Sequence, residues 1–173
     1  ALAGFGSDML VGNTLNNLLG GGPGDDVING GDGNDTFWEQ FATNNMSVTL
    51  NDDGTGSSVG DGQSGAVGST GSDTLIGIEN ISTGSGNDTL NGNFLDNILN
   101  GGPGNDQLNG GAGNDTYQFG EGWGVDLVNE NSGSGLDTMD FSSVSADLEI
   151  LFGSVHVTDG VNTANHNGNS IEV

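Results

Sequence analysis

The stretch GGPGDDVIN, from Gly21 to Asn29, is followed without a gap by GGDGNDTFW, from Gly30 to Trp38. Both nonapeptides carry Gly at positions one, two and four, Asp at position six and a large apolar residue at position eight. Several Gly residues within six positions permit the positive φ angles of a tight turn. A single inward-pointing apolar side chain is typical of a short, half-buried strand. The sequence therefore predicts a turn followed by a strand, repeated every nine residues.

The same pattern extends outward from this pair in both directions. Two looser rows precede it, AGFGSDMLV from Ala3 and GNTLNNLLG from Gly12. A second set of four begins with TGSGNDTLN at Thr83, and each of its rows starts 80 positions after its counterpart in the first set. Three flanking rows, from Gly68, Glu121 and Ser132, keep Gly at position four and Asp at position six. A fixed period of this kind indicates a repeat architecture built from two copies of a larger unit.

The composition shows why such rows need a ligand. The chain of 173 residues has 24 acidic side chains, no Lys or Arg, and a formal net charge of −24. Only 31% of its residues are hydrophobic and 35 are Gly, a combination that normally leaves a chain disordered. Cysteine is absent, so neither a disulfide nor a thiolate metal site can stabilise the fold. The neutralising charge must come from outside.

The same composition excludes several classes of function. Nucleic acids and anionic polysaccharides are bound through Lys and Arg, which this chain lacks. No run approaches the roughly 18 apolar residues of a membrane span, and no signal peptide is expected in this segment. The sequence offers no Ser/His/Asp arrangement, no phosphate-binding loop and no Lys for Schiff-base chemistry, so we do not expect an enzyme.

The pattern G-G-x-G-x-D-x-U-x resembles the RTX, or haemolysin-type, calcium-binding nonapeptide repeat family. We expect an all-β fold, a right-handed parallel β-roll in which two rows complete one circuit and Ca²⁺ is held between stacked turns. Antiparallel β segments should lie between and after the two roll blocks. The predicted division is a first calcium-binding block over 1–40, a strand and a Gly/Ser-rich loop over 41–67, a second block over 68–143, and a C-terminal hairpin region over 144–173.

In this roll the position-eight side chains form the core, which is predicted to comprise Leu10, Leu19, Ile28, Phe37, Leu90, Leu99, Leu108 and Tyr117. Consecutive rows face opposite edges, so the turn of one row stacks on the turn two rows later and brings the position-six side chains together. The predicted pairs are Asp8 with Asp26, Asn17 with Asp35, Asp88 with Asp106, Asn97 with Asp115, Asp106 with Asp126, and Asp115 with Asp137.

Two stacked carboxylates need a cation between them. A hard divalent ion with six to eight oxygen ligands suits Asp carboxylates and turn carbonyls, whereas zinc or copper would prefer His or Cys. We therefore predict several Ca²⁺ ions, held more weakly where Asn replaces Asp. The predicted side-chain ligands are Asp8, Asn17, Asp26, Asp35, Asp73, Asp88, Asn97, Asp106, Asp115, Asp126 and Asp137. The predicted carbonyl ligands belong to Gly22, Gly24, Gly31, Gly33, Gly102, Gly104, Gly111 and Gly113.

Outside the rows the periodicity changes. Between residues 39 and 67 we expect one strand, over Met46 to Leu50, followed by a long loop. Gly77 to Ile81 interrupts the rows and resembles the step by which RTX sequences re-enter a calcium block. Alternating apolar residues after Phe141, with Asp159-Gly160 and Asn167-Gly168, predict antiparallel hairpins. The last residues repeat the pattern found before the second block, so a further block is expected to follow.

The leading functional hypothesis is a calcium-binding structural module of a larger secreted protein, unfolded where calcium is scarce and folded outside the cell. The family resemblance implies an extracellular or cell-surface location and type I secretion from a Gram-negative bacterium. Expected partners are calcium ions and neighbouring repeat modules. The alternative is an adhesive or carbohydrate-binding accessory module for neutral glycans. Trp38 and Trp123 are expected to pack over the roll rather than to stack on sugars.

Overall fold

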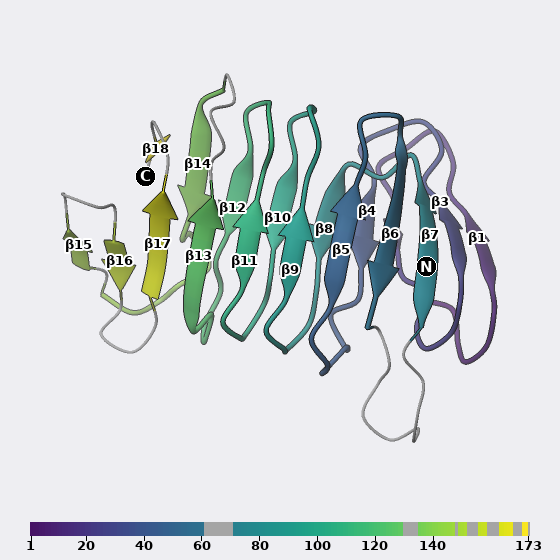
Figure 1. Cartoon of the computed structure of the whole chain (residues 1–173), viewed down its shortest axis with the longest axis horizontal. Coiled ribbons are helices and arrows are strands. Elements are labelled where there is room, and N and C mark those ends of the chain that lie inside the picture. The colour runs from purple at the N-terminus through teal and green to yellow at the C-terminus, as the bar shows by residue number, and fades with distance from the viewer. Residues whose placement is uncertain are drawn as a thin grey trace.

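The structure is a computed structural model that describes residues 1–60, 71–129 and 135–147 and the backbone of four short strands after residue 148. Every regular element in the described part is a β-strand (Figure 1). No helix long and apolar enough to cross a membrane occurs among these residues. The chain is all-β, as predicted from its rows.

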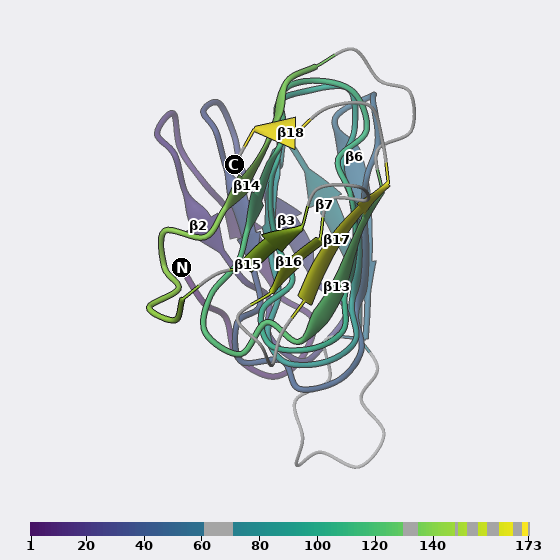
Figure 2. The ribbon, with the colours of Figure 1, turned by 90° about the vertical axis from the view of Figure 1, so that its left-hand side faces the viewer.

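The strands form two sheets that face each other as the long sides of a flattened coil (Figure 2). The eleven-stranded sheet contains β1 (Met9–Val11), β3 (Val27–Asn29), β7 (Ser72–Ile76), β6 (Thr55–Val59), β5 (Ser47–Leu50), β9 (Thr89–Asn91), β11 (Gln107–Asn109), β13 (Val125–Asn129), β17 (Thr163–Asn167), β16 (His156–Thr158) and β15 (Glu149–Leu151), in that order. The seven-stranded sheet runs β18 (Ile171–Glu172), β14 (Asp137–Asp140), β12 (Thr116–Gln118), β10 (Ile98–Asn100), β8 (Asn80–Ser82), β4 (Thr36–Trp38) and β2 (Leu18–Leu19).

Each row contributes one strand, and successive rows alternate between the two sheets. β1 pairs in parallel with β3, with Leu10 opposite Ile28, and β2 pairs in parallel with β4, with Leu19 opposite Phe37. The second set of rows repeats this arrangement, with β9 beside β11 and β10 beside β12. The predicted parallel β-roll, with each row stacked on the row two places later, is therefore confirmed.

The core is a single layer of side chains between the sheets. All eight predicted position-eight residues are at most 9% exposed, while the flanking strand residues are exposed or half-buried. This pattern follows from the strand period of two, which turns only the central residue of a three-residue strand inward. The predicted core column is confirmed along both blocks.

The segment between the blocks contains one strand more than predicted. β5 is the expected strand, but β6, over Thr55–Val59, pairs antiparallel with both β5 and β7 where a loop was expected. Its inward residues are Gly56 and Ser58, so it lacks the apolar alternation by which strands are recognised. A turn closed by Gly54, with φ of 81°, joins it to β5. Residues 61–70, where the predicted loop continues, lie outside the described part.

The C-terminal strands are partly antiparallel. β15, β16 and β17 form the expected antiparallel pairs. The run of alternating residues from Val144 was predicted to be a strand, but the described strand there begins only at Glu149. The expected hairpin after β17 is also wrong, because β17 pairs in parallel with β13 and β18 pairs in parallel with β14. These strands continue the roll.

Trp123 lies inside the roll and not on its surface. It is 1% exposed and forms an aromatic cluster with Phe119 and Phe141, whose stacked rings have centroids 4.5 Å apart. Trp38 is half-buried and packs edge-on against Phe41, with centroids 5.5 Å apart. The prediction that Trp123 packs against the roll and is not an exposed ring on which a sugar could stack is confirmed.

Candidate metal-binding turns

The turns between strands form two columns, one along each edge of the roll. We call the turns that lead into the eleven-stranded sheet the first edge and those that lead into the seven-stranded sheet the second edge. On the first edge, the residues just before the strands, and Asp73 within β7, are Asp8, Asp26, Asp73, Asp88, Asp106 and Asp126. On the second edge, the position-six residues are Asn17, Asp35, Asn97, Asp115 and Asp137.

Adjacent position-six residues on an edge are in direct contact. The backbone N–H of Asp8 donates to Oδ1 of Asp26 at 2.7 Å, and that of Asp88 donates to Oδ1 of Asp106 at 2.8 Å. On the second edge the N–H of Asn17 donates to Oδ1 of Asp35 at 2.6 Å. The remaining predicted pairs have the same bond: Asn97 to Asp115, Asp106 to Asp126, and Asp115 to Asp137. Asp73, which was given no partner, accepts from the N–H of Asp26 at 3.0 Å.

The second oxygen of these carboxylates is buried without a hydrogen bond. Five buried side-chain oxygens in the described part lack any partner, and all five are the Oδ2 atoms of position-six residues: Asp26, Asp35, Asp88, Asp106 and Asp115. Each of these residues is at most 1% exposed. A buried ionised carboxylate without a partner costs several kcal/mol, so such an oxygen is normally paired or coordinates a metal.

In four of the five rows with an unpaired Oδ2, a Gly at position one makes room for that oxygen, whereas Thr83 occupies this position in the row of Asp88. A Cβ placed on Gly101 would lie 2.2 Å from Oδ2 of Asp106, and one on Gly110 would lie 2.2 Å from Oδ2 of Asp115. Gly21 and Gly30 stand in the same relation to Asp26 and Asp35. Any side chain at position one would therefore occupy the place next to the unpaired oxygen. The Gly at position one was recognised as part of the repeat but was given no role at the metal site.

Backbone carbonyls of neighbouring turns lie in the same gap. A Cβ on any Gly predicted as a carbonyl ligand would lie between 1.6 and 2.9 Å from a carbonyl oxygen of the turn two rows earlier. Gly104 lies against the carbonyl of Gly86, and Gly24 against that of Gly6. The remaining six, Gly22, Gly31, Gly33, Gly102, Gly111 and Gly113, are packed in the same way. Carbonyl and carboxylate oxygens thus share the space between stacked turns.

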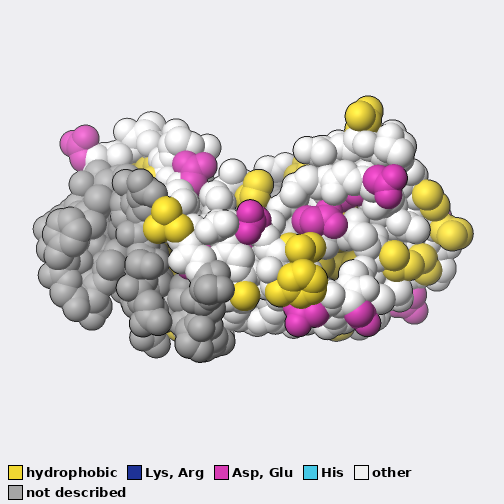
Figure 3. All heavy atoms as spheres, turned by 90° about the horizontal axis from the view of Figure 1, so that it is seen from above, with side chains coloured by type: hydrophobic (Ala, Val, Ile, Leu, Met, Phe, Trp, Pro, Cys, Tyr) yellow, Lys and Arg dark blue, Asp and Glu magenta, His cyan; other side chains and the backbone are white. Residues whose placement is uncertain are grey.

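Three of the column carboxylates, those of Asp106, Asp115 and Asp126, have raised pKa values. Burial raises the pKa of Asp106 to about 7 and that of Asp126 to about 8, and the negative charge of the neighbouring column members adds to the shift. Burial likewise raises the pKa of Asp115 to about 6. No Lys or Arg offsets these charges, and the view onto the second edge shows acidic but no basic side chains (Figure 3).

A second ladder uses the exposed side chains at position five. Oδ1 of Asn87 accepts the N–H of Asn105 at 3.0 Å, and Oδ1 of Asn105 accepts the N–H of Val125 at 2.9 Å. On the second edge Oδ1 of Asp96 accepts the N–H of Asn114 at 2.7 Å. In this ladder the side chain of the earlier row accepts, whereas at position six the side chain of the later row accepts. Position five was not among the predicted ligand positions, although Asn or Asp occupies it in most rows.

The donor set fits a hard divalent cation. The described residues contain no group of three or more His, Cys, Asp or Glu side chains arranged for a metal ion. A site between two turns must therefore combine carboxylate oxygens with backbone carbonyls, which is the mixture that Ca²⁺ accepts. The unpaired Oδ2 atoms and the carbonyls beside the Gly residues supply this mixture. A metal that requires imidazole or thiolate finds no ligand in these turns.

Comparison with known families agrees with this geometry. The family model described as "RTX calcium-binding nonapeptide repeat (4 copies)" matches residues 2–37, 76–94 and 92–122. The chain carries RTX calcium-binding repeats. The predicted resemblance is therefore confirmed, and the RTX rows coincide with the strands and turns of the roll. Repeats of this family bind calcium and are structural rather than catalytic, and proteins that contain them are typically secreted by the type I route.

No curated protein gave a significant match to this chain. Among solved structures, the extracellular lipase LipA from Serratia marcescens is similar at 18% identity, with a TM-score of 0.34. The match covers 97% of this chain and 37% of the lipase chain. A TM-score this low supports no argument about this chain.

Proposed function

We propose that this chain is a calcium-binding structural module of a larger secreted bacterial protein, and that it folds when calcium binds outside the cell. The ions would lie between stacked turns, held by the position-six side chains and by the carbonyls next to the position-two and position-four Gly residues. Pairs that contain two Asp residues would bind more tightly than those with Asn, since ligand charge is one determinant of Ca²⁺ affinity. No residue of the chain is assigned a catalytic role.

The five unpaired Oδ2 atoms are the observation that supports this proposal most directly. These oxygens are buried without a hydrogen-bond partner, and no Lys or Arg of the chain offsets their charge. A divalent ion supplies charge to both carboxylates of a pair and uses the carbonyls that line the same gap. Because the ion binds the folded chain and not the unfolded one, its binding free energy adds to the stability of the fold.

Circular dichroism of the whole chain at pH 8 tests the proposal. In excess chelator the spectrum is expected to be that of an unfolded chain, and millimolar Ca²⁺ should restore the β-sheet signal. Mg²⁺ at the same concentration should restore much less, because it demands an octahedral shell and releases its waters reluctantly. A β-sheet spectrum that persists at pH 8 without any divalent ion would contradict the proposal.

A further inference from the structure

The short loop Gly77-Ile78-Glu79 takes the place of a complete turn on the second edge. β8, which follows the loop, pairs with β4 so that Asn80 lies opposite Thr36 and Ile81 lies opposite Phe37. Thr36 and Phe37 occupy positions seven and eight of their row, so Glu79 occupies position six by register. Three residues thus replace the usual six, and Ile78, at 4% exposed, anchors the loop in the core.

Glu79 makes the contacts that an Asp makes at this position. The N–H of Asp35 donates to Oε2 of Glu79 at 2.7 Å, just as the N–H of Asn17 donates to Oδ1 of Asp35. The N–H of Asn80 donates to the carbonyl of Asp35 at 2.9 Å, matching the bond from Thr36 to the carbonyl of Asn17 at 2.9 Å. The additional methylene of Glu lets its carboxylate reach this place from a shorter loop.

Gly77 supplies the carbonyl that a position-one residue supplies elsewhere. A Cβ on Gly30 would lie 2.1 Å from the carbonyl oxygen of Gly77 and 2.4 Å from Oδ2 of Asp35. One row pair earlier, a Cβ on Gly12 would lie 2.0 Å from the carbonyl oxygen of Gly30 and 2.2 Å from Oδ1 of Asn17. The loop therefore offers both the carbonyl and the carboxylate of a regular turn.

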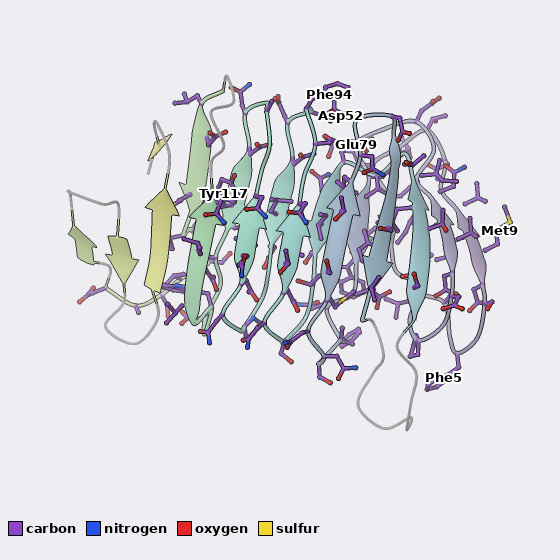
Figure 4. The ribbon with its side chains drawn as sticks, viewed as in Figure 1. Phe5, Met9, Asp52, Glu79, Phe94 and Tyr117 are labelled. Atoms are coloured by element: carbon purple, nitrogen blue, oxygen red, sulfur yellow. The ribbon has the colours of Figure 1, made fainter. Side chains whose placement is uncertain are left out.

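The unpaired oxygen of Asp35 points independently to a ligand here. Asp35 is fully buried, and its Oδ2 has no hydrogen-bond partner although it lies beside the Gly77 carbonyl. Figure 4 shows Glu79 on the second edge, where the two blocks of rows meet. Asp35 belongs to the first block, while β10 of the second block pairs with the strand that follows Glu79.

We propose that Glu79 is a calcium ligand, and that one ion shared by Asp35 and Glu79 joins the two blocks across the second edge. The inference rests on the proposed function, because it requires that the regular turns bind calcium. It extends that function to a residue outside the nonapeptide rows. The ion makes the second edge one continuous column, so that the two blocks fold together and not one by one.

The test compares Glu79→Gln with Asp96→Asn in the whole chain. Gln keeps an oxygen that can accept the N–H of Asp35, so the stacking is retained and only the charge is lost. Asp96 lies at position five of the same edge, and Asn occupies that position in other rows, so its variant removes one charge without removing a proposed ligand. Native mass spectrometry and calorimetric titration would count the calcium ions, and circular dichroism in saturating calcium would verify folding.

Glu79→Gln is expected to bind one ion fewer than the wild type, or to bind one ion at least ten-fold more weakly, while Asp96→Asn keeps the wild-type count. Hydrogen exchange at limiting calcium should show faster exchange in residues 30–38 of Glu79→Gln alone. A wild-type chain that binds no calcium would overturn the proposed function itself. A wild type that binds calcium, together with a Glu79→Gln variant of unchanged ion count, affinity and exchange, would overturn only the role of Glu79.

Discussion

The two edges of the roll are built from the same kind of row but distribute their charge differently. The first edge has Asp at every position six of its regular rows, yet it is divided where the antiparallel strand β6 enters the sheet and where Met46 precedes β5. The N–H of Met46 still donates to Oδ1 of Asp88 at 2.8 Å, but the side chain of Met46 has no oxygen that could bind an ion. The second edge has Asn at two of its six positions, Asn17 and Asn97, and crosses the junction through Glu79.

This difference concerns two separate effects of calcium, the tight binding of ions within a block and the connection of the two blocks. On the first edge, burial and, to a smaller extent, the charge of neighbouring carboxylates raise the pKa of Asp106 and Asp126, and this edge should bind ions most tightly. The sparser second edge should bind each ion more weakly but connects the two blocks. Calcium affinity should therefore be highest on the first edge, whereas the second edge connects the two blocks. The predictions below concern this difference between the edges.

The largest effect is expected from pH in the metal-free chain. The folded-state pKa values of Asp115, Asp106 and Asp126, about 6, 7 and 8, lie above the ordinary value near 3.8. Stability that depends on their neutral forms is fully present below the ordinary pKa and is lost as pH rises through about 6 to 8. Metal-free protein should therefore gain β structure when it is acidified from pH 8 to pH 5, and Asp115 should ionise before Asp106 and Asp126 when the pH is raised again.

Circular dichroism against pH, without metal and in millimolar calcium, measures this effect. In calcium the affinity should fall with acid, because protons compete for the same oxygens. If protonation only released the ion, acid would unfold the chain. Because the carboxylates are buried, their protonated forms also stabilise the fold, so loss of the fold on acidification does not follow. A metal-free chain that is equally unfolded at pH 5 and pH 8 would contradict the prediction.

Next in size should be the effect of filling the space at position one. In Gly101→Ala on the first edge and Gly110→Ala on the second, the new Cβ meets the Oδ2 of Asp106 or Asp115 at 2.2 Å. Each should lower the free energy of unfolding in calcium by roughly 3 kcal/mol, near the upper end for single substitutions. Gly120→Ala is the control, because a Cβ there meets nothing within 4 Å. Denaturant titrations in saturating calcium would show whether a Cβ at position one destabilises the two edges equally.

A smaller effect should distinguish the edges by charge. Asp106 lies between Asp88 and Asp126, whereas Asp115 lies between Asn97 and Asp137. Asp106→Asn should raise the calcium concentration at the folding midpoint about ten-fold, equivalent to about 1.4 kcal/mol, and Asp115→Asn only about three-fold. Calcium titrations followed by circular dichroism give both midpoints. A larger shift for Asp115→Asn would mean that local charge does not set affinity.

The smallest effect is expected when a carboxylate is added to the second edge. Asn17→Asp keeps the oxygen that accepts the N–H of Asn13 and places a second charge beside Asp35. The calcium midpoint should fall about three-fold, or about 0.7 kcal/mol. The metal-free chain should become slightly less stable through the added repulsion. An unchanged or higher midpoint in titrations of the variant would argue against charge as the reason for the weaker second edge.

The period-nine pattern was sufficient to predict the roll, its core and the pairing of its turns. Strand register follows from the single apolar residue at position eight, because a slip of one residue would expose it. Once alternate rows face opposite edges, the neighbours of each Asp follow without further information. For this reason the contacts of Asp26 with Asp8, and of Asp106 with Asp88, could be predicted from the sequence.

The parts that could not be predicted carry no apolar or periodic signal. β6 turns Gly56 and Ser58 inward, and Ser58 is buried because its hydroxyl donates to Asp73 at 2.7 Å. Glu79 was missed because its loop has half the length of a regular turn, so its place appears only when the strands are paired. The ladder at position five involves exposed side chains, which do not affect the hydrophobic pattern. It could have been suspected from the recurrence of Asn and Asp there.

The opposite directions of the two side-chain ladders have a consequence for alignment. Where position five of the earlier row is Asn or Asp, two bonds join a turn to the turn two rows earlier. The position-six side chain of the later row accepts an N–H of the earlier row, and the position-five side chain of the earlier row accepts an N–H of the later row, as Asn87, Asp88, Asn105 and Asp106 show. A row displaced by one residue would break both bonds, whichever way it moved. Where both bonds are present, polar atoms therefore fix the alignment of two stacked turns independently of the apolar core. A chain this poor in large side chains can therefore keep many nearly identical rows from exchanging places.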